Sequence, residues 1–135
     1  MSCKSAVYIA NTTATNVATN SDIPLGAIQR RYGCSLDATS GGVILKNCGY
    51  YLVNATITFT APTTGTVTVA LRDNGVNVVG ATASETVNTA TTEVHTIAIT
   101  GIVRVLNGDA PDTLTLLNTG IEITPSNVAV TVVKI

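Results

Sequence analysis

The sequence predicts an all-β protein, a β-sandwich or jelly roll of antiparallel strands, from three observations. First, 24 of its 135 residues are Thr and 17 are Val, and these β-branched residues suit a pleated sheet better than a helix. Second, apolar and polar residues alternate along residues 50–60, as they do in a strand with one buried face. Third, turn signals rich in Asn and Gly recur at short, even intervals, which is typical of a sandwich or jelly roll.

The clearest strand covers residues 50–60, where the odd positions are apolar and the even positions include Asn and Thr. The sequence Pro-Thr-Thr-Gly at 62–65 ends it, and residues 66–72 resume the alternation. The turn Asp73-Asn74-Gly75 follows. Because Asn and Gly tolerate positive φ, residues 71–79 predict a β-hairpin.

Two later segments, 94–106 and 128–135, are apolar on both faces. We expect Gly101 to form a bulge or kink in the first of them, a turn at 107–109, and a short strand at 113–117. The outer face of a sandwich should be polar, so a second apolar face predicts that a neighbouring subunit covers it.

Residues 11–22, rich in Thr and Asn, are expected to form a surface excursion. In all we expect about ten strands, near the following residues: Ala6, Ala27, Ser35, Val43, Tyr51, Val67, Val78, Ile97, Leu114 and Val130.

Composition excludes several classes of function. A chain of 135 residues is one domain, spanning residues 1–135. Charged residues make up 11% and the net charge is −1, so there is no basic stripe for nucleic acid. No apolar run approaches the roughly 18 residues that cross a membrane, and the high apolar content argues against disorder. We therefore expect no nucleic-acid partner and no membrane insertion.

The N-terminal residues and the three cysteines bear on the cellular compartment. Residues 1–5 lead directly into strand-like sequence without the apolar stretch of a secretory signal. The cysteines are Cys3, Cys34 and Cys48, an odd number with no Cys-x-x-Cys pair, which argues against zinc. Either Cys34 pairs with Cys48 in an oxidising environment, or all three are small buried apolar residues.

Four sequence pieces, in order, carry a resemblance to a known family. They are Gly-Tyr-Tyr-Leu-Val at 49–53, Leu-Arg-Asp-Asn-Gly-Val-Asn-Val at 71–78, Asn-Gly-Asp at 107–109 followed by Leu114 and Leu116, and the final strand 127–135. Together they resemble the jelly rolls of tumour necrosis factor (TNF) and of complement globular heads. The final strand is similar to the bacterial branch, found on spore-surface collagen-like glycoproteins and in proteins of Firmicutes and their phages. Val53 departs from the family, which usually has Phe there. The resemblance implies a ten-stranded jelly roll and a tight trimer about a three-fold axis.

Candidate chemical sites are sparse, and each has an ordinary structural interpretation. His95 and Glu93 would face the same side of a strand, but His95 is the only histidine and no nucleophile motif accompanies it. Asp109 and Asp112 offer too few oxygens for calcium and suit turn capping. The glycosylation sequons at residues 11 and 54 are expected by chance in a chain rich in Thr and Asn. We therefore predict no catalytic residues, no metal site and no cofactor.

The remaining candidates are positions for contact with other molecules. Arg30 and Arg31 form an adjacent pair that either binds an anionic ligand or makes a structural ion pair. Arg104 interrupts an apolar strand and is expected near the three-fold axis. The expected trimer interface consists of the following residues: Ile97, Ile99, Arg104, Val128, Val130, Val133 and Ile135.

These observations predict a non-enzymatic homotrimeric module that acts by assembly and surface attachment. We expect a bacteriophage virion protein, such as a head fibre, a capsid decoration or a tail-associated knob, located in the virion. Its partners would be copies of itself, capsid or tail proteins, and a host cell-surface glycan. The alternative is an adhesion head on a bacterial cell or spore surface, binding glycan or protein.

Overall fold

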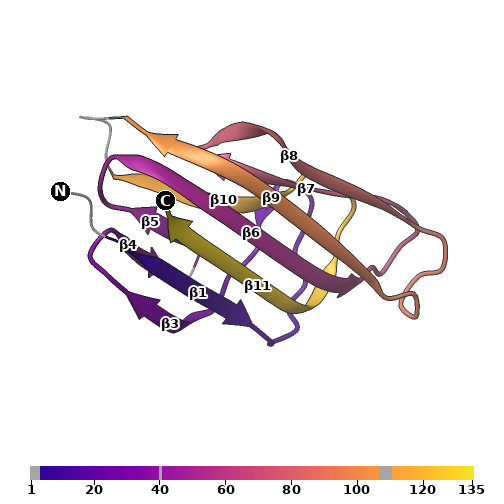
Figure 1. Ribbon diagram of the computed structural model, residues 1–135. Helices are drawn as coiled ribbons and strands as arrows, with labels where there is room; N and C mark the ends of the chain where they lie inside the picture. Colours follow the sequence, from indigo (N-terminus) through magenta and orange to yellow (C-terminus); the bar gives the residue numbers. More distant parts are fainter. Residues whose placement is uncertain (1–3, 40, 107–110) are drawn as a thin grey trace.

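A computed structural model describes residues 4–39, 41–106 and 111–135, and these residues form eleven strands (Figure 1). The strands are β1 (Ala6–Asn11), β2 (Ser21–Asp22), β3 (Ala27–Tyr32), β4 (Leu36–Thr39), β5 (Gly42–Leu45), β6 (Gly49–Thr60), β7 (Gly65–Asp73), β8 (Val76–Val87), β9 (His95–Val105), β10 (Asp112–Asn118) and β11 (Thr124–Lys134). The predicted all-β sandwich is confirmed.

The strands form two antiparallel sheets that face each other. The five-stranded sheet has the order β3-β1-β11-β6-β9, and the six-stranded sheet has the order β4-β5-β10-β7-β8, with β2 added beside β10. Figure 1 shows the five-stranded sheet in front, with β3 and β9 at its two edges. Because neighbouring strands come from distant parts of the chain, the topology brings residues together that are far apart in sequence.

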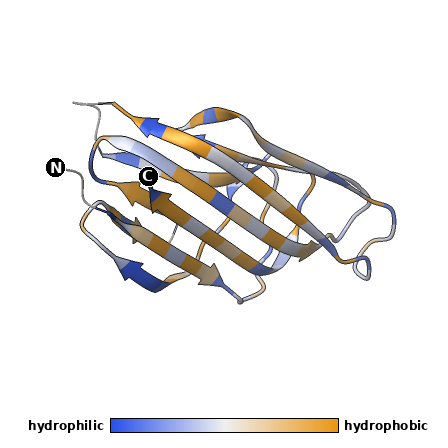
Figure 2. Ribbon diagram, in the orientation of Figure 1, coloured by the Kyte–Doolittle hydropathy of each residue, from blue (hydrophilic) through white to orange (hydrophobic). Residues whose placement is uncertain are grey.

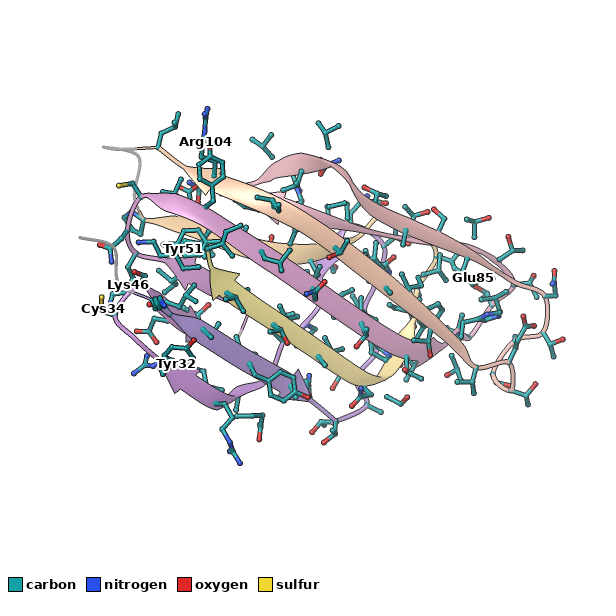
Figure 3. All side chains as sticks on the ribbon, in the orientation of Figure 1. Tyr32, Cys34, Lys46, Tyr51, Glu85 and Arg104 are labelled. Carbon is teal, nitrogen blue, oxygen red and sulfur yellow. The ribbon has the colours of Figure 1, made fainter. Side chains whose placement is uncertain are left out.

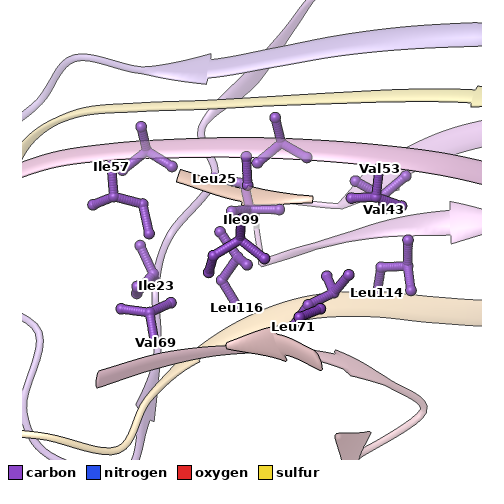
Figure 4. Close-up of a cluster of buried hydrophobic side chains, with 14 of the residues drawn as sticks. Ile23, Leu25, Val43, Val53, Ile57, Val69, Leu71, Ile99, Leu114 and Leu116 are labelled. Atoms are coloured by element: carbon purple, nitrogen blue, oxygen red, sulfur yellow. The ribbon is translucent and has the colours of Figure 1, made fainter. Parts of the chain in front are cut away.

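The core lies between the two sheets and follows the alternation of side chains along each strand. In β6 the buried residues are Tyr51, Val53, Ala55, Ile57 and Phe59, each 2% exposed or less. Figure 2 shows this alternation along the front strands, and Figure 4 shows apolar side chains of both sheets meeting in the interior. The pattern read from residues 50–60 therefore orients β6 correctly.

The predicted hairpin at 71–79 is confirmed. Strands β7 and β8 pair as far as Asp73 opposite Val76, and a two-residue turn joins them. In this turn Asn74 has φ 50° and Gly75 has φ 84°, the positive values that a tight hairpin of this hand requires.

Three expectations about the strands need correction. All ten predicted strands occur, and β2 is an eleventh, formed by two residues inside the segment 11–22. That segment is more than a surface excursion, because Val17 is buried in the core and pairs with Ile123.

Gly101 forms no bulge, since it pairs with Val53 in unbroken register. A β-carbon at Gly101 would lie 3.4 Å from the Ala81 side chain, so close approach of β8 accounts for the glycine. The expected turn at 107–109 lies outside the described residues.

The cysteines also differ from both expectations. Cys34 is disulfide-bonded and Cys48 is a free, exposed thiol, so these two do not pair. Cys34 is exposed as well, which excludes the buried-residue interpretation for both, while Cys3 lies outside the described residues.

Among the residues described, no helix is long and apolar enough to cross a membrane.

Candidate functional site

The outer face of the five-stranded sheet carries a line of apolar side chains that runs across every strand. Strand register places these residues side by side: Tyr32 on β3, Ala6 on β1, Val133 on β11, Leu52 on β6 and Ile102 on β9. We call this line the apolar row. Tyr32 is 61% exposed and Ile102 is 57% exposed, and the three residues between them are half-buried.

Further apolar groups lie beside the apolar row at the end of the sheet that carries the C-terminus. Tyr50 is 49% exposed, Leu106 is 48% exposed and Ile135 is 64% exposed. Ile135 is held there because its N–H donates to the Tyr50 carbonyl at 2.9 Å. Figure 3 shows Tyr32 and Arg104 at the two edges of the sheet at this same end. Exposed apolar groups gathered on one face are typical of an interaction surface.

The rest of this face has small, uncharged side chains in its middle strands. The next two lines across β11, β6 and β9 consist of Thr131, Asn54 and Thr100, then Ala129, Thr56 and Ala98. The Thr100 hydroxyl donates to the Asn54 side chain, and the hydroxyls of Thr58 and Thr96 lie 3.1 Å apart. This middle part of the face can approach another protein surface without burying a charge.

The structure places only three of the seven expected interface residues on this face. Val133 belongs to the apolar row, and Ile135 and Arg104 lie beside it. The other four expected interface residues lie instead in the core and are at most 4% exposed: Ile97, Ile99, Val128 and Val130. The expected set took residues from both faces of β9 and β11, and these four face the core, because Ile97 and Val128 both pair with core-facing Ile57.

Arg104 lines a cavity of about 490 Å³ between the β7–β8 hairpin and β9. Asp73 and Asp112 also line it. Burial, followed by the hydrogen bond and the charge of Asp112, raises the pKa of Asp73 to about 7. At neutral pH the Asp73 carboxyl therefore holds a proton much of the time.

The surroundings of this acid pair suggest a structural role. The Asn74 side-chain amide donates to Asp112 Oδ1 at 3.1 Å, and Asn74 Oδ1 accepts from the Thr113 N–H at 2.8 Å. Asp112 thus takes part in fixing the hairpin turn, as the capping interpretation predicts, whereas Asp109 lies outside the described residues. Within the described part of the chain, no three His, Cys, Asp or Glu residues gather as a metal site.

His95 lies between two carboxylates at the opposite end of the sandwich. Its Nε2 is 2.5 Å from Glu93 Oε1, and its Nδ1 is 3.7 Å from Glu85 Oε1. Glu93 also accepts the N–H groups of Asn88 and Thr89 at 3.0 and 2.7 Å. The hydrogen bond from His95 and those backbone bonds lower the pKa of Glu93.

His95 and Glu93 lie side by side as expected, but Glu93 precedes β9, which begins at His95, and so does not belong to the strand. Glu85 was not foreseen, because it comes from the neighbouring strand β8. The hydrogen bonds of this cluster fix the loop between β8 and β9, and the cluster contains no nucleophile.

The two arginines of β3 have different roles. Arg31 Nη1 forms an ion pair with Asp37 Oδ1 at 2.8 Å, which is the structural alternative. Among the described residues Arg30 has no carboxylate partner, and its Nη1 donates to the Gln29 carbonyl at 2.7 Å. Of the pair, only Arg30 remains available for a ligand.

Comparisons with known proteins identify the fold. No family model and no curated protein matches the sequence. Among solved structures, Eiger TNF from S. frugiperda matches with a TM-score of 0.69 and 16% identity, covering 98% of this chain and 92% of that one. The globular domain of zebrafish complement 1qA matches with a TM-score of 0.65 and 8% identity, covering 93% and 94%. The PRD1 vertex protein P5 matches with a TM-score of 0.60 and 16% identity, covering 100% and 99%.

The protein therefore has the TNF/C1q-like jelly-roll fold that its sequence resembles. At identities of 8–16%, the likeness establishes the fold, and function has to be argued from the side chains of the outer face.

Proposed function

We propose that this protein is a non-enzymatic homotrimeric head that assembles through the outer face of its five-stranded sheet and serves as a structural and attachment protein of a phage virion. The observation that carries the proposal is the apolar row. It places two strongly exposed apolar side chains, Tyr32 and Ile102, at opposite edges of one sheet, with no charged group between them.

A ring of three subunits requires two different patches on each subunit, because a three-fold axis joins one patch to another. The two ends of the apolar row meet this requirement. A β3 edge carrying Tyr32 on one subunit would pack near the β9 edge carrying Ile102 on the next. A stable interface needs about 800 Å² from each partner, so the uncharged Thr and Ala residues beside the row would be buried too.

The mass of the protein in solution tests the assembly. Light scattering on a size-exclusion column should give three times the 13.8 kDa chain mass. Ile102→Asp places a charge in the apolar row and should give the mass of one chain, because burying an unpaired carboxylate opposes association. Thr66→Asp adds the same charge to an exposed position on β7, in the other sheet, and should leave the mass unchanged. A native protein with the mass of one chain at every concentration contradicts the proposal.

Two observations support the location in a virion. P5 is a vertex protein of the phage PRD1 and matches this chain along its whole length. In addition, a surface rich in Thr and poor in charge repels its neighbours weakly, which suits dense packing on a particle. Capsid or tail proteins and a host cell-surface glycan would be its partners. Antibody labelling of purified virions should decorate the particles, and labelling of uninfected cells or spores instead would favour a bacterial adhesion head.

A further inference from the structure

A second hollow lies on the outer face of the five-stranded sheet, at the edge that β3 forms. Its volume is about 460 Å³, within the 300–1,000 Å³ range of small-molecule sites. The residues that line it are Tyr8, Ala10, Thr12, Gln29, Arg30 and Asn127. It begins at Tyr8 opposite Arg30, which is two residue pairs from the apolar row and the next pair on the same face, and it runs away from the row along β1.

A β-bulge aims two consecutive residues of β3 at this hollow. Tyr8 pairs with Arg30 and Ile9 pairs with Ile28, so Gln29 has no residue opposite it. In a regular strand adjacent side chains point to opposite faces, and Gln29 and Arg30 would not share a cavity. The bulge brings both to the same hollow, which is a known way for an edge strand to redirect a side chain.

The charge of Arg30 is uncompensated in the hollow. None of the lining residues is acidic, and the hydrogen bond that Arg30 donates to the Gln29 carbonyl within the described part of the chain uses one of its five N–H donors. Arg31, the next residue, is neutralised by Asp37 at 2.8 Å. A guanidinium with free donors in a hollow without acids favours a carboxylate, which it can bind through two parallel hydrogen bonds.

The other lining groups suit a sugar ring. Tyr8 is 38% exposed and offers a ring face, while Ala10 is small and leaves room beside it. The amides of Gln29 and Asn127 and the hydroxyl of Thr12 can donate to and accept from sugar hydroxyls. Thr12 is positioned by a turn in which Asn11 Oδ1 accepts the Thr13 N–H at 3.0 Å.

We propose that this hollow binds a carboxylated sugar, such as a uronic acid residue of a surface glycan. Arg30 holds the carboxylate, Tyr8 packs against the ring, and the amides bind the hydroxyls. The inference names the glycan class for the attachment role proposed above and rests on that role, but its test does not depend on the oligomeric state.

The test is a titration of the native protein with D-galacturonate, followed by saturation-transfer NMR. For a ligand of this size with one charged contact we expect a Kd on the order of 1 mM. The methyl ester of the same sugar, which lacks the charge, should bind at least about tenfold more weakly. Acetate should also bind at least about tenfold more weakly, because it leaves the sugar contacts unused.

Two variants at adjacent positions separate the site from nonspecific charge effects. Arg30→Gln should weaken binding at least about tenfold, whereas Arg31→Gln, which removes the same charge outside the hollow, should leave it unchanged. The mass of each variant is measured in parallel, so that failure of assembly and failure of binding are seen separately. Equal binding of galacturonate and its ester, equal binding of acetate, or equal loss in both variants would overturn the inference.

Discussion

Replacing Asp73 by Asn should stabilise the protein above pH 7 and remove much of a pH dependence imposed by the acid pair. In the native protein burial and the neighbouring Asp112 raise the pKa of Asp73 from 3.8 to about 7. The folded state therefore holds a proton that the unfolded chain releases near pH 4. The contribution of this proton to the free energy of unfolding is fully present below pH 4. It falls as the pH rises to 7 and is lost where Asp73 is charged in the folded state.

The magnitude follows from the difference between the two pKa values. Each pKa unit corresponds to about 1.4 kcal/mol, so the full difference would cost about 4 kcal/mol. Because the carboxyl is in part accessible to water, screening reduces this to about 1–2 kcal/mol. An Asn side chain at position 73 is neutral at every pH, and its amide can donate to Asp112 as the protonated Asp73 carboxyl does.

Urea unfolding at pH 4.5, 7 and 8.5 measures the effect. The native protein should lose stability across this range, and Asp73→Asn should exceed it by about 1–2 kcal/mol at pH 8.5 while matching it more closely at pH 4.5. Asp37→Asn serves as a control, because that exposed ion pair is worth about 1 kcal/mol or less. If Asp73→Asn is less stable than the native protein at pH 8.5, the argument from the raised pKa of Asp73 is refuted.

Two further predictions concern the core and the cysteines. Phe59→Ala should destabilise the protein by about 3–5 kcal/mol, because the side chain is fully buried in the core between the two sheets. Urea unfolding measures this loss, and a loss below about 1 kcal/mol would contradict the described packing. Without reduction, iodoacetamide should modify Cys48, the free exposed thiol, and leave Cys34 unmodified because it is disulfide-bonded. Peptide mass mapping before and after reduction distinguishes the two, and modification of Cys34 before reduction would contradict that bond.

The fold was predictable from local pattern because period-two alternation and Asn-Gly turns are properties of short segments. The orientation of a strand was predictable only where one face is clearly polar, as in β6. Strand β9 carries apolar residues on both faces, with Ile99 and Val103 on one and Ile102 on the other. The alternation therefore does not reveal which face is buried. The structure resolves this through pairing: Ile97 and Ile99 lie beside the core-facing residues of β6, and Ile102 lies beside Leu52 on the outside.

The candidate sites depend on contacts between distant segments, which no local pattern contains. Asp73 meets Asp112 because β7 pairs with β10, and Glu85 approaches His95 across β8 and β9. The hollow beside Arg30 depends on a single bulged residue, Gln29. The sequence did single out the Arg30–Arg31 pair, but only the ion pair of Arg31 with Asp37 distinguishes their roles.

The two surfaces proposed for assembly and for ligand binding lie on the same outer face and differ in their chemistry. The apolar row has exposed ends at both sheet edges, which suits repeated contact between identical subunits. The hollow beside it has one uncompensated cation and hydrogen-bonding side chains, which suits a polar ligand that is bound and released. Because the two surfaces meet at Tyr8 and Ala6 on β1, each subunit interface would end next to a hollow. A trimer would then present three copies of the hollow together, and weak binding of single sugars would be strengthened by multivalency on a glycan-covered surface.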